Sequence, residues 1–75
     1  MRSIHDLALD KVRTMLVGRR VRLVRTTDSY TALVPGDEGT VDLVDDMGTV
    51  HVLWDNGSTL GLIPDEDQWT VISDD

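Results

Sequence analysis

The sequence predicts a mainly β protein, a five-stranded SH3-like barrel preceded by one N-terminal amphipathic helix. Two observations lead to this fold class. Apolar residues follow helical spacing near the N-terminus, and from Arg19 onward they alternate with other residues in short segments divided by glycine-containing turns. A chain of 75 residues is long enough for one small core. We therefore expect a single domain over 1–75, with the helix at 4–17 and the barrel at 19–72.

The N-terminal segment carries one apolar stripe with three- and four-residue spacing, which is typical of an amphipathic helix. The members of the stripe are Ile4, Leu7, Ala8, Val12, Met15 and Leu16. Gly18 stands where a helix stop belongs, and Asp10 and Arg13 have the spacing of a pair on the outer side. We expect the stripe to pack on the domain's own core, while packing against a second chain stays open.

Five short segments with a period of two are expected as strands, in a meander in which sequential strands are neighbours. The first follows Arg19, and a long turn-rich segment, TTDSYTALVPGDEG, separates it from the second. Closure into a barrel would remove the exposed edges of so small a sheet. The other four expected strands are Thr40–Val44, Thr49–Trp54, Thr59–Ile63 and Trp69–Ile72.

The clearest hairpin lies in Gly48–Leu62, which reads GTVHVLWDNGSTLGL. Alternation on both sides of a short Asp-Asn-Gly-Ser turn predicts a loop of two to four residues, with positive φ at Asn56 and Gly57. The same alternation places Trp54 and the two valines before it on the inner face. Leu53 then falls on the outer face, together with the histidine two residues before it.

Charge is distributed unevenly along the chain, which has a net charge of −7. The first 25 residues hold all seven Lys and Arg residues and two acids, a net charge of +5, whereas the other fifty hold twelve acids and no Lys or Arg, −12. Such asymmetry bears on partners and solubility rather than on fold. The chain has no cysteine and no apolar run near the ~20 residues of a membrane span, so we expect a cytoplasmic protein.

Catalytic and metal-binding patterns are weak. His5 and His51 are the two histidines, there is no cysteine, and no serine stands in a nucleophile-elbow motif. The acid pairs in the turns lack the alternating ligands and distal Glu of a calcium loop. Gly36 and Gly39 are interpreted as turn residues because a strand, not a helix, follows them, so no phosphate loop is predicted. We expect no enzyme activity, no cofactor and no metal.

Several short patterns together resemble a family of small SH3-like domains of unknown function from bacteria and their phages. The patterns are GxRVxL at Gly18–Leu23, DxYTxLxPG at Asp28–Gly36, GTV at Gly39–Val41, VxWDxGSxL at Val52–Leu60 and DxW at Asp67–Trp69. The resemblance implies the barrel fold and a bacterial or phage-infected cell as the setting. It implies no reaction, because that family has no assigned activity.

The main functional hypothesis is a small acidic binding module that docks on a basic surface of a partner protein. The acids expected to make the contact are Asp45, Asp46, Asp55, Asp65, Glu66 and Asp67. The expected apolar anchors are Tyr30, Leu53 and Trp69. The most specific version, by analogy with phage and mobile-element proteins, is a DNA mimic that inhibits host defence, of anti-CRISPR or anti-restriction type.

The alternative hypothesis is a nucleic-acid-binding barrel that uses its basic first strand. The phosphate-contacting residues would be Arg19, Arg20, Arg22 and Arg25. The net charge of −7 and the three aromatic residues in the whole chain count against it, because single-stranded binding sites combine positive charge with stacking surfaces.

Overall fold

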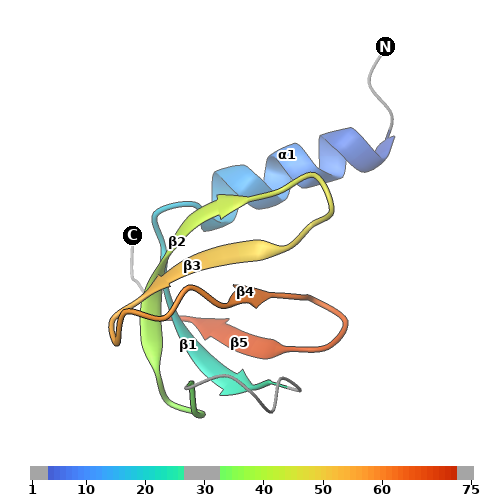
Figure 1. Cartoon of the computed structure of the whole chain (residues 1–75). Coiled ribbons are helices and arrows are strands. Elements are labelled where there is room, and N and C mark those ends of the chain that lie inside the picture. The colour runs from blue at the N-terminus through green and yellow to red at the C-terminus, as the bar shows by residue number, and fades with distance from the viewer. Residues whose placement is uncertain (1–3, 27–32, 73–75) are drawn as a thin grey trace.

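A computed structural model describes residues 4–26 and 33–72 of the chain, with backbone only for 4–7. One helix is followed by five strands (Figure 1). The helix ends at Leu16, one residue before the predicted end, and the strands follow the predicted order. The elements are α1 (Ile4–Leu16), β1 (Arg20–Arg25), β2 (Glu38–Val44), β3 (Val50–Trp54), β4 (Gly61–Leu62) and β5 (Gln68–Val71).

The strands form one antiparallel sheet in the order β4-β3-β2-β1-β5. Sequential strands are neighbours from β1 to β4, as predicted, but β5 pairs with β1 and not with β4. The predicted mainly β fold with five strands is thus confirmed, but the sheet is not closed, and β4 and β5 are its two edges. The predicted fourth strand, Thr59–Ile63, is reduced to Gly61–Leu62. The residue before this strand bonds to a side chain instead, because the Leu60 carbonyl accepts a hydrogen bond from Trp54 Nε1 at 2.9 Å.

One face of the sheet builds the core, which consists of aliphatic side chains and one indole. Trp54 is buried on β3, while Leu53 points to the opposite face, as the alternation predicts. Trp69 and Leu16 pack against the core from the side. The buried hydrophobic residues are Val21, Leu23, Leu33, Val41, Val44, Val50, Val52, Trp54 and Leu62.

The β3–β4 turn closes a three-residue loop. The Gly57 amide donates to the Trp54 carbonyl at 2.9 Å, and Trp54 N donates to Ser58 O at 3.3 Å. Gly57 has a φ of 87°, but no described residue other than glycine has positive φ, so the prediction for Asn56 is wrong. This loop type needs one left-handed residue, at its last position. Asn56 contributes through its side chain instead, with Oδ1 accepting from Ser58 N at 2.9 Å.

Gly39 lies inside β2, opposite Trp54, and not in a turn as predicted. A side chain here would meet the neighbouring strand, because an ideal Cβ would lie 2.6 Å from Val52 Cγ1 and 2.7 Å from the Leu53 carbonyl oxygen. Gly36, by contrast, has a φ of 99° and fits its predicted turn role. Glycine at position 39 therefore permits the close approach of β2 and β3.

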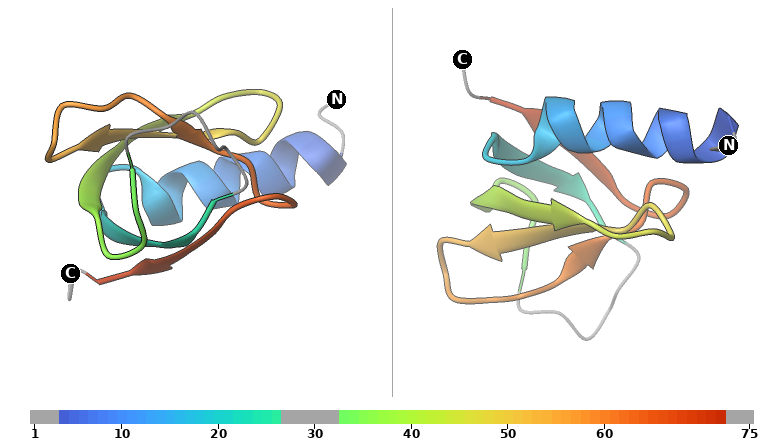
Figure 2. Two further views of the ribbon diagram at one scale, coloured as in Figure 1. Left: turned by 60° about the horizontal axis from the view of Figure 1, so that its bottom comes forward. Right: turned by 90° about the horizontal axis from the view of Figure 1, so that it is seen from above.

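Helix α1 lies against the part of β2 that extends beyond the start of β1, and its N-terminal half projects past the sheet (Figures 1 and 2). Leu16 packs against the core, and Leu9 is the nearest side chain to Gly48. Met15, on the predicted stripe, is 67% exposed, and Val12 and Ala8 are also exposed. The prediction that the stripe packs on the core is therefore confirmed for Leu16 and wrong for the three exposed residues. The side of the helix that faces the sheet carries Leu9, Arg13 and Leu16.

Candidate partner-binding site

Two turns meet at one end of the sheet. The β2–β3 turn and the β4–β5 turn are adjacent because β3 pairs with β4, with Val50 opposite Leu62. All views place both turns at the same end, on the side to which the N-terminal half of α1 projects (Figures 1 and 2). We call this surface the acidic end. It consists of the exposed residues Asp46, Met47, Ile63, Asp65 and Glu66.

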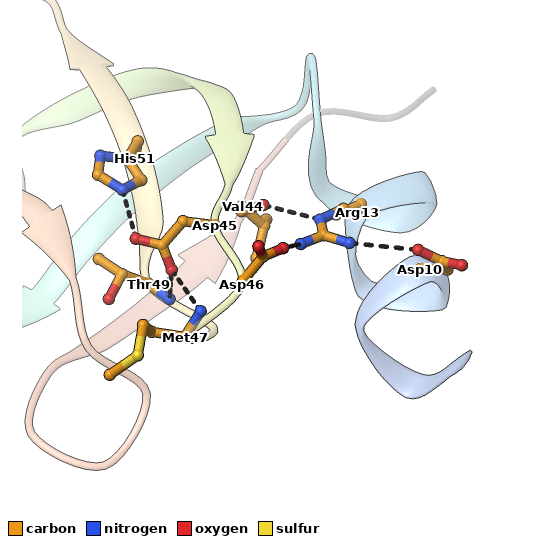
Figure 3. Close-up of polar contacts among 8 residues, drawn as sticks. All are labelled: Asp10, Arg13, Val44, Asp45, Asp46, Met47, Thr49 and His51. Atoms are coloured by element: carbon orange, nitrogen blue, oxygen red, sulfur yellow. Dashed lines mark hydrogen bonds and ion pairs between the residues drawn. The ribbon is translucent and has the colours of Figure 1, made fainter. Parts of the chain in front are cut away.

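Asp45 builds the β2–β3 turn (Figure 3). Its Oδ1 accepts hydrogen bonds from Met47 N at 2.9 Å and Thr49 N at 3.0 Å, and its Oδ2 lies 2.9 Å from His51 Nε2. The hydrogen bond with His51, followed by those from the two amides, lowers the pKa of the Asp45 carboxyl below its ordinary value. The structure therefore gives Asp45 a turn-forming role, and its oxygens face the protein's own donors.

Asp46, the next residue, presents its side chain to solvent at the tip of the turn. It shares the guanidinium of Arg13, whose NH2 lies 2.7 Å from Asp46 Oδ1, with Asp10 on the helix (Figure 3). The predicted Asp10–Arg13 pair is confirmed at 3.2 Å. Arg13 Nε also donates to the Val44 carbonyl at 2.8 Å. Arg13 thus joins α1 to the end of β2 and to the β2–β3 turn. It also covers backbone at the end of β2 that would otherwise be open.

Asp67 closes the β4–β5 turn from inside. Its side chain accepts from Ile63 N at 2.8 Å through Oδ2 and from the Thr26 hydroxyl at 2.9 Å through Oδ1, and the residue is 7% exposed. The amides of Glu66 and Asp67 both donate to the Ile63 carbonyl, as in a single helical turn. Asp67 is therefore structural in this conformation, and the turn it closes carries Asp65 and Glu66 in solvent.

Asp55 lies in the β3–β4 turn, at the opposite end of the sheet from the acidic end (Figure 1). Both of its carboxylate oxygens accept from Arg20, at 2.8 and 2.6 Å. This bidentate pair lowers the pKa of Asp55 and raises that of Arg20, with the hydrogen bonds as the largest cause in each. The structure thus separates Asp55 from the other five predicted acids and gives it an internal partner.

The basic strand proposed as the alternative site is partly matched by acids of the same chain. Arg20 and Arg22 both lie near Glu38, with NH2 to carboxylate distances of 3.5 and 3.1 Å. Arg19 donates through Nε to the Met15 carbonyl at 3.3 Å, and Arg25 is exposed at the end of β1. Two of the four predicted phosphate-binding guanidinium groups are thus engaged in ion pairs on the sheet.

Comparison with known proteins points to one family. The family model described as "Domain of unknown function (DUF4314)" matches residues 5–72, from the first turn of α1 to the residue after β5. The chain belongs to the DUF4314 family. No curated protein and no solved structure matches it. The resemblance to a small domain of unknown function is therefore confirmed, and the family assigns no activity to any residue of this DUF4314 chain.

The two predicted apolar anchors that the structure describes, Leu53 and Trp69, are not among the exposed residues of the acidic end. Leu53 is exposed on the outer face of the sheet, Trp69 is half-buried against the core, and Tyr30 lies outside the described residues. Instead, the acidic end of the DUF4314 chain carries Met47, which is 89% exposed, and Ile63. Met47 could have been found from the sequence, because a residue between two acids and a glycine in a tight turn has no core to enter.

The described part of the DUF4314 chain contains neither a cluster of metal-ligating side chains nor a membrane-spanning helix. Among residues 4–26 and 33–72, no group of three or more His, Cys, Asp or Glu side chains could hold a metal ion. His51 pairs with Asp45, and the side chain of His5 lies outside the described part. Within the same described part, no helix has the length and hydropathy of a membrane span.

Proposed function

We propose that this DUF4314 chain is a non-enzymatic binding module whose acidic end docks on a basic surface of a partner protein. The observation that carries the proposal is the gathering of Asp46, Asp65 and Glu66 at one end of the sheet, on two turns that Asp45 and Asp67 hold in shape. Asp46 also pairs with Arg13, so the charge offered to a partner comes mainly from Asp65 and Glu66. Turns shaped by buried or bonded carboxylates present their neighbours in a fixed arrangement. Such preorganisation lowers the cost of binding.

Charge and apolar area have different tasks at this surface. The net charge of −7 attracts a basic partner from a distance, and the exposed acids orient it, which mainly raises the association rate. Met47 and Ile63 supply apolar area that a partner can cover, which mainly lengthens the lifetime of the complex. A methionine suits this task because its flexible side chain adapts to the surface it meets.

The most specific version of the proposal is an inhibitor of host defence, of anti-CRISPR or anti-restriction type, carried by a phage or mobile element. Carboxylates on a small module would cover a nucleic-acid-binding surface as a DNA mimic does, in the cytoplasm of the bacterial or infected cell. In the same proposal we assign the fold to the SH3-like barrels, which the strand order β4-β3-β2-β1-β5, with the last strand beside the first, supports. The inhibitor function and the assignment to the SH3-like barrels both rest on analogy.

Direct nucleic-acid binding through β1 has less support. Arg20 is held by Asp55 and Glu38, and Arg22 by Glu38, so a phosphate would have to displace carboxylates of the same chain. The net charge of −7 would also repel a polyanion.

The test is affinity capture from bacterial lysate at low and high salt, followed by measurement of binding rates with the captured partner. Glu66→Lys should slow association several-fold, and its effect should shrink as salt rises. Asp42→Lys is the matched control, because it changes the net charge equally from an exposed position in β2. Met47→Ala should speed dissociation instead. Binding that ignores charge reversal and ionic strength would exclude the proposal, and capture of nucleic acid alone would favour the basic strand.

A further inference from the structure

The outer face of the sheet carries a small apolar surface of its own. Register places Leu53 opposite Thr40 and Thr40 opposite Arg20, so these three side chains form one row across β3, β2 and β1. The next row brings Leu43 opposite His51. Directly opposed residues of antiparallel strands share a face, and so do residues two apart on one strand. We call Thr40, Leu43, His51 and Leu53 the outer patch.

The outer patch exposes two leucines that have no place in the core. Leu53 is 56% exposed and Leu43 is 45% exposed. A single leucine in solvent is ordinary, but two on neighbouring strands of one sheet face form a joined apolar surface. The bulge of β2 between Val41 and Leu43 turns Leu43 outward beside this row.

Most charges next to the outer patch are paired with a partner of the opposite sign or, for Asp45, with His51 of the patch itself. Arg20 and Arg22 stand beside Asp55 and Glu38, with ion pairs at 2.6 and 3.1 Å. Exposed Asp42, at the bulge, adds one negative charge at the border. Two copies with a charge of −7 each repel one another over most of their surface. They repel least where positive and negative groups are paired, which is at this face.

We propose that the outer patch is a self-association surface and that its occupant is the outer patch of a second copy of the chain. The two sheets would stack face to face about a two-fold axis that passes near Leu53, so that the leucines of one copy cover those of the other. The bordering Arg20 of each copy then faces a rim that also contains Asp55 and Glu38. Because this face carries both signs of charge, it can be complementary to the same face of a second copy. The acidic end cannot, because it needs a surface of the opposite charge.

This contact does not rest on the proposed function, and its salt dependence has the opposite sign. Added salt screens the repulsion between two chains of charge −7 and strengthens self-association. The same salt weakens docking of the acidic end on a basic partner. Failure of one proposal can therefore be told apart from failure of the other.

The experiment is sedimentation equilibrium of the full chain from about 10 μM to about 1 mM, the range in which weak dimers dissociate. We expect a monomer–dimer equilibrium that shifts toward dimer as salt rises. Leu53→Lys should raise the dissociation constant at least about tenfold, because a charge would enter the apolar centre of the contact. Met15→Lys is the matched control, since it places the same group on an exposed apolar position of α1.

Leu43→Lys is a second test of the outer patch, for the case that Leu53→Lys lowers the melting temperature. It should also raise the dissociation constant of the dimer. The proposal is overturned if the chain stays monomeric over the whole range. It is also overturned if the dimer survives both leucine variants, or if Met15→Lys disrupts the dimer as strongly as they do, which would place the contact on α1.

Discussion

Gly39→Ala should destabilise the fold although it adds one methyl group. Gly39 is buried in β2, and its φ is not positive, so the effect would be steric and not a matter of backbone strain. The added Cβ would lie 2.6 Å from Val52 Cγ1, 2.7 Å from Leu53 O and 2.9 Å from Trp54 Cα. Two of these three atoms belong to the backbone of β3 and cannot rotate away. β2 and β3 must therefore move apart where Gly39 lies opposite Trp54.

Overpacking of a tight core site costs about 1–3 kcal/mol, which is a large part of the stability of so small a domain. Each kcal/mol corresponds to about 4–8 °C in melting temperature at this size. Urea unfolding followed by tryptophan fluorescence measures the change, because Trp54 is buried beside Gly39.

Gly61→Ala is the control for Gly39→Ala. Its Cβ would meet the Thr49 methyl group at 2.8 Å and the His51 ring only at 3.8 Å, and a threonine side chain can shift. We expect a smaller loss of stability than at position 39. The steric reasoning fails if the free energy of unfolding of Gly39→Ala lies within about 0.5 kcal/mol of that of the natural chain. It also fails if Gly61→Ala lowers this free energy more than Gly39→Ala does.

Three further perturbations test the turns and the core. Trp54→Ala should cost about 3–5 kcal/mol and leave the chain largely unfolded by circular dichroism; a folded variant that only lost its partner would show a functional tryptophan instead. Gly57→Val should lose about 1 kcal/mol or more in thermal unfolding, because a branched residue disfavours the left-handed region, and unchanged melting would contradict the observed turn. The pKa of Asp45 is lowered from 3.8, chiefly by the hydrogen bond with His51. Its contribution to stability is therefore complete above the unfolded pKa and is lost as the pH falls through the lower folded pKa. Asp45→Asn should flatten the acid limb of a stability–pH curve, and an unaltered limb would refute that assignment.

Local patterns made the hairpins predictable from the sequence. The alternation from Val50 to Trp54 depends only on residues next to one another in the chain, and so does the need for a glycine at the end of a tight loop. The inner position of Trp54 and the left-handed conformation of Gly57 followed from them. The prediction for Asn56 is wrong because several short loops share the Asn-Gly signal, and the choice among them depends on hydrogen bonds across the loop.

Contacts between distant parts of the chain could not be predicted in this way. Arg13 bonds to Val44 and Asp46, which are 31 and 33 positions away, and these bonds decide which side of α1 faces the sheet. Leu16 of the predicted stripe lies on that side but Val12 and Met15 do not, because periodicity shows an apolar face and not the polar contacts that compete with it. Gly39 is a similar case, since only the register of β2 against β3 shows what a side chain there would meet.

The six acids predicted to bind a partner show the same limit. Asp67 and Asp65 stand two residues apart in one polar turn, and nothing local distinguishes them. The structure makes Asp67 a buried acceptor for Ile63 N and the Thr26 hydroxyl, and leaves Asp65 in solvent. Net charge therefore overstates the charge that a partner would meet, and the subset at the acidic end emerges only after the internal bonds are assigned.

The uneven charge along the sequence acquires a structural meaning once these bonds are assigned. The basic N-terminal third is partly matched inside the fold, where Arg13, Arg20 and Arg22 each face an acid from β2 or from a turn that follows β2 or β3. This pairing leaves Asp65 and Glu66 exposed on the β4–β5 turn, and it leaves most charges of the outer face paired. A protein with both features should show two opposite responses to salt, with weaker docking at the acidic end and stronger self-association at the outer patch. The first response follows from attraction between unlike charges, and the second from screened repulsion between like ones. Observing both in one preparation would locate the two contacts on separate surfaces of the same sheet.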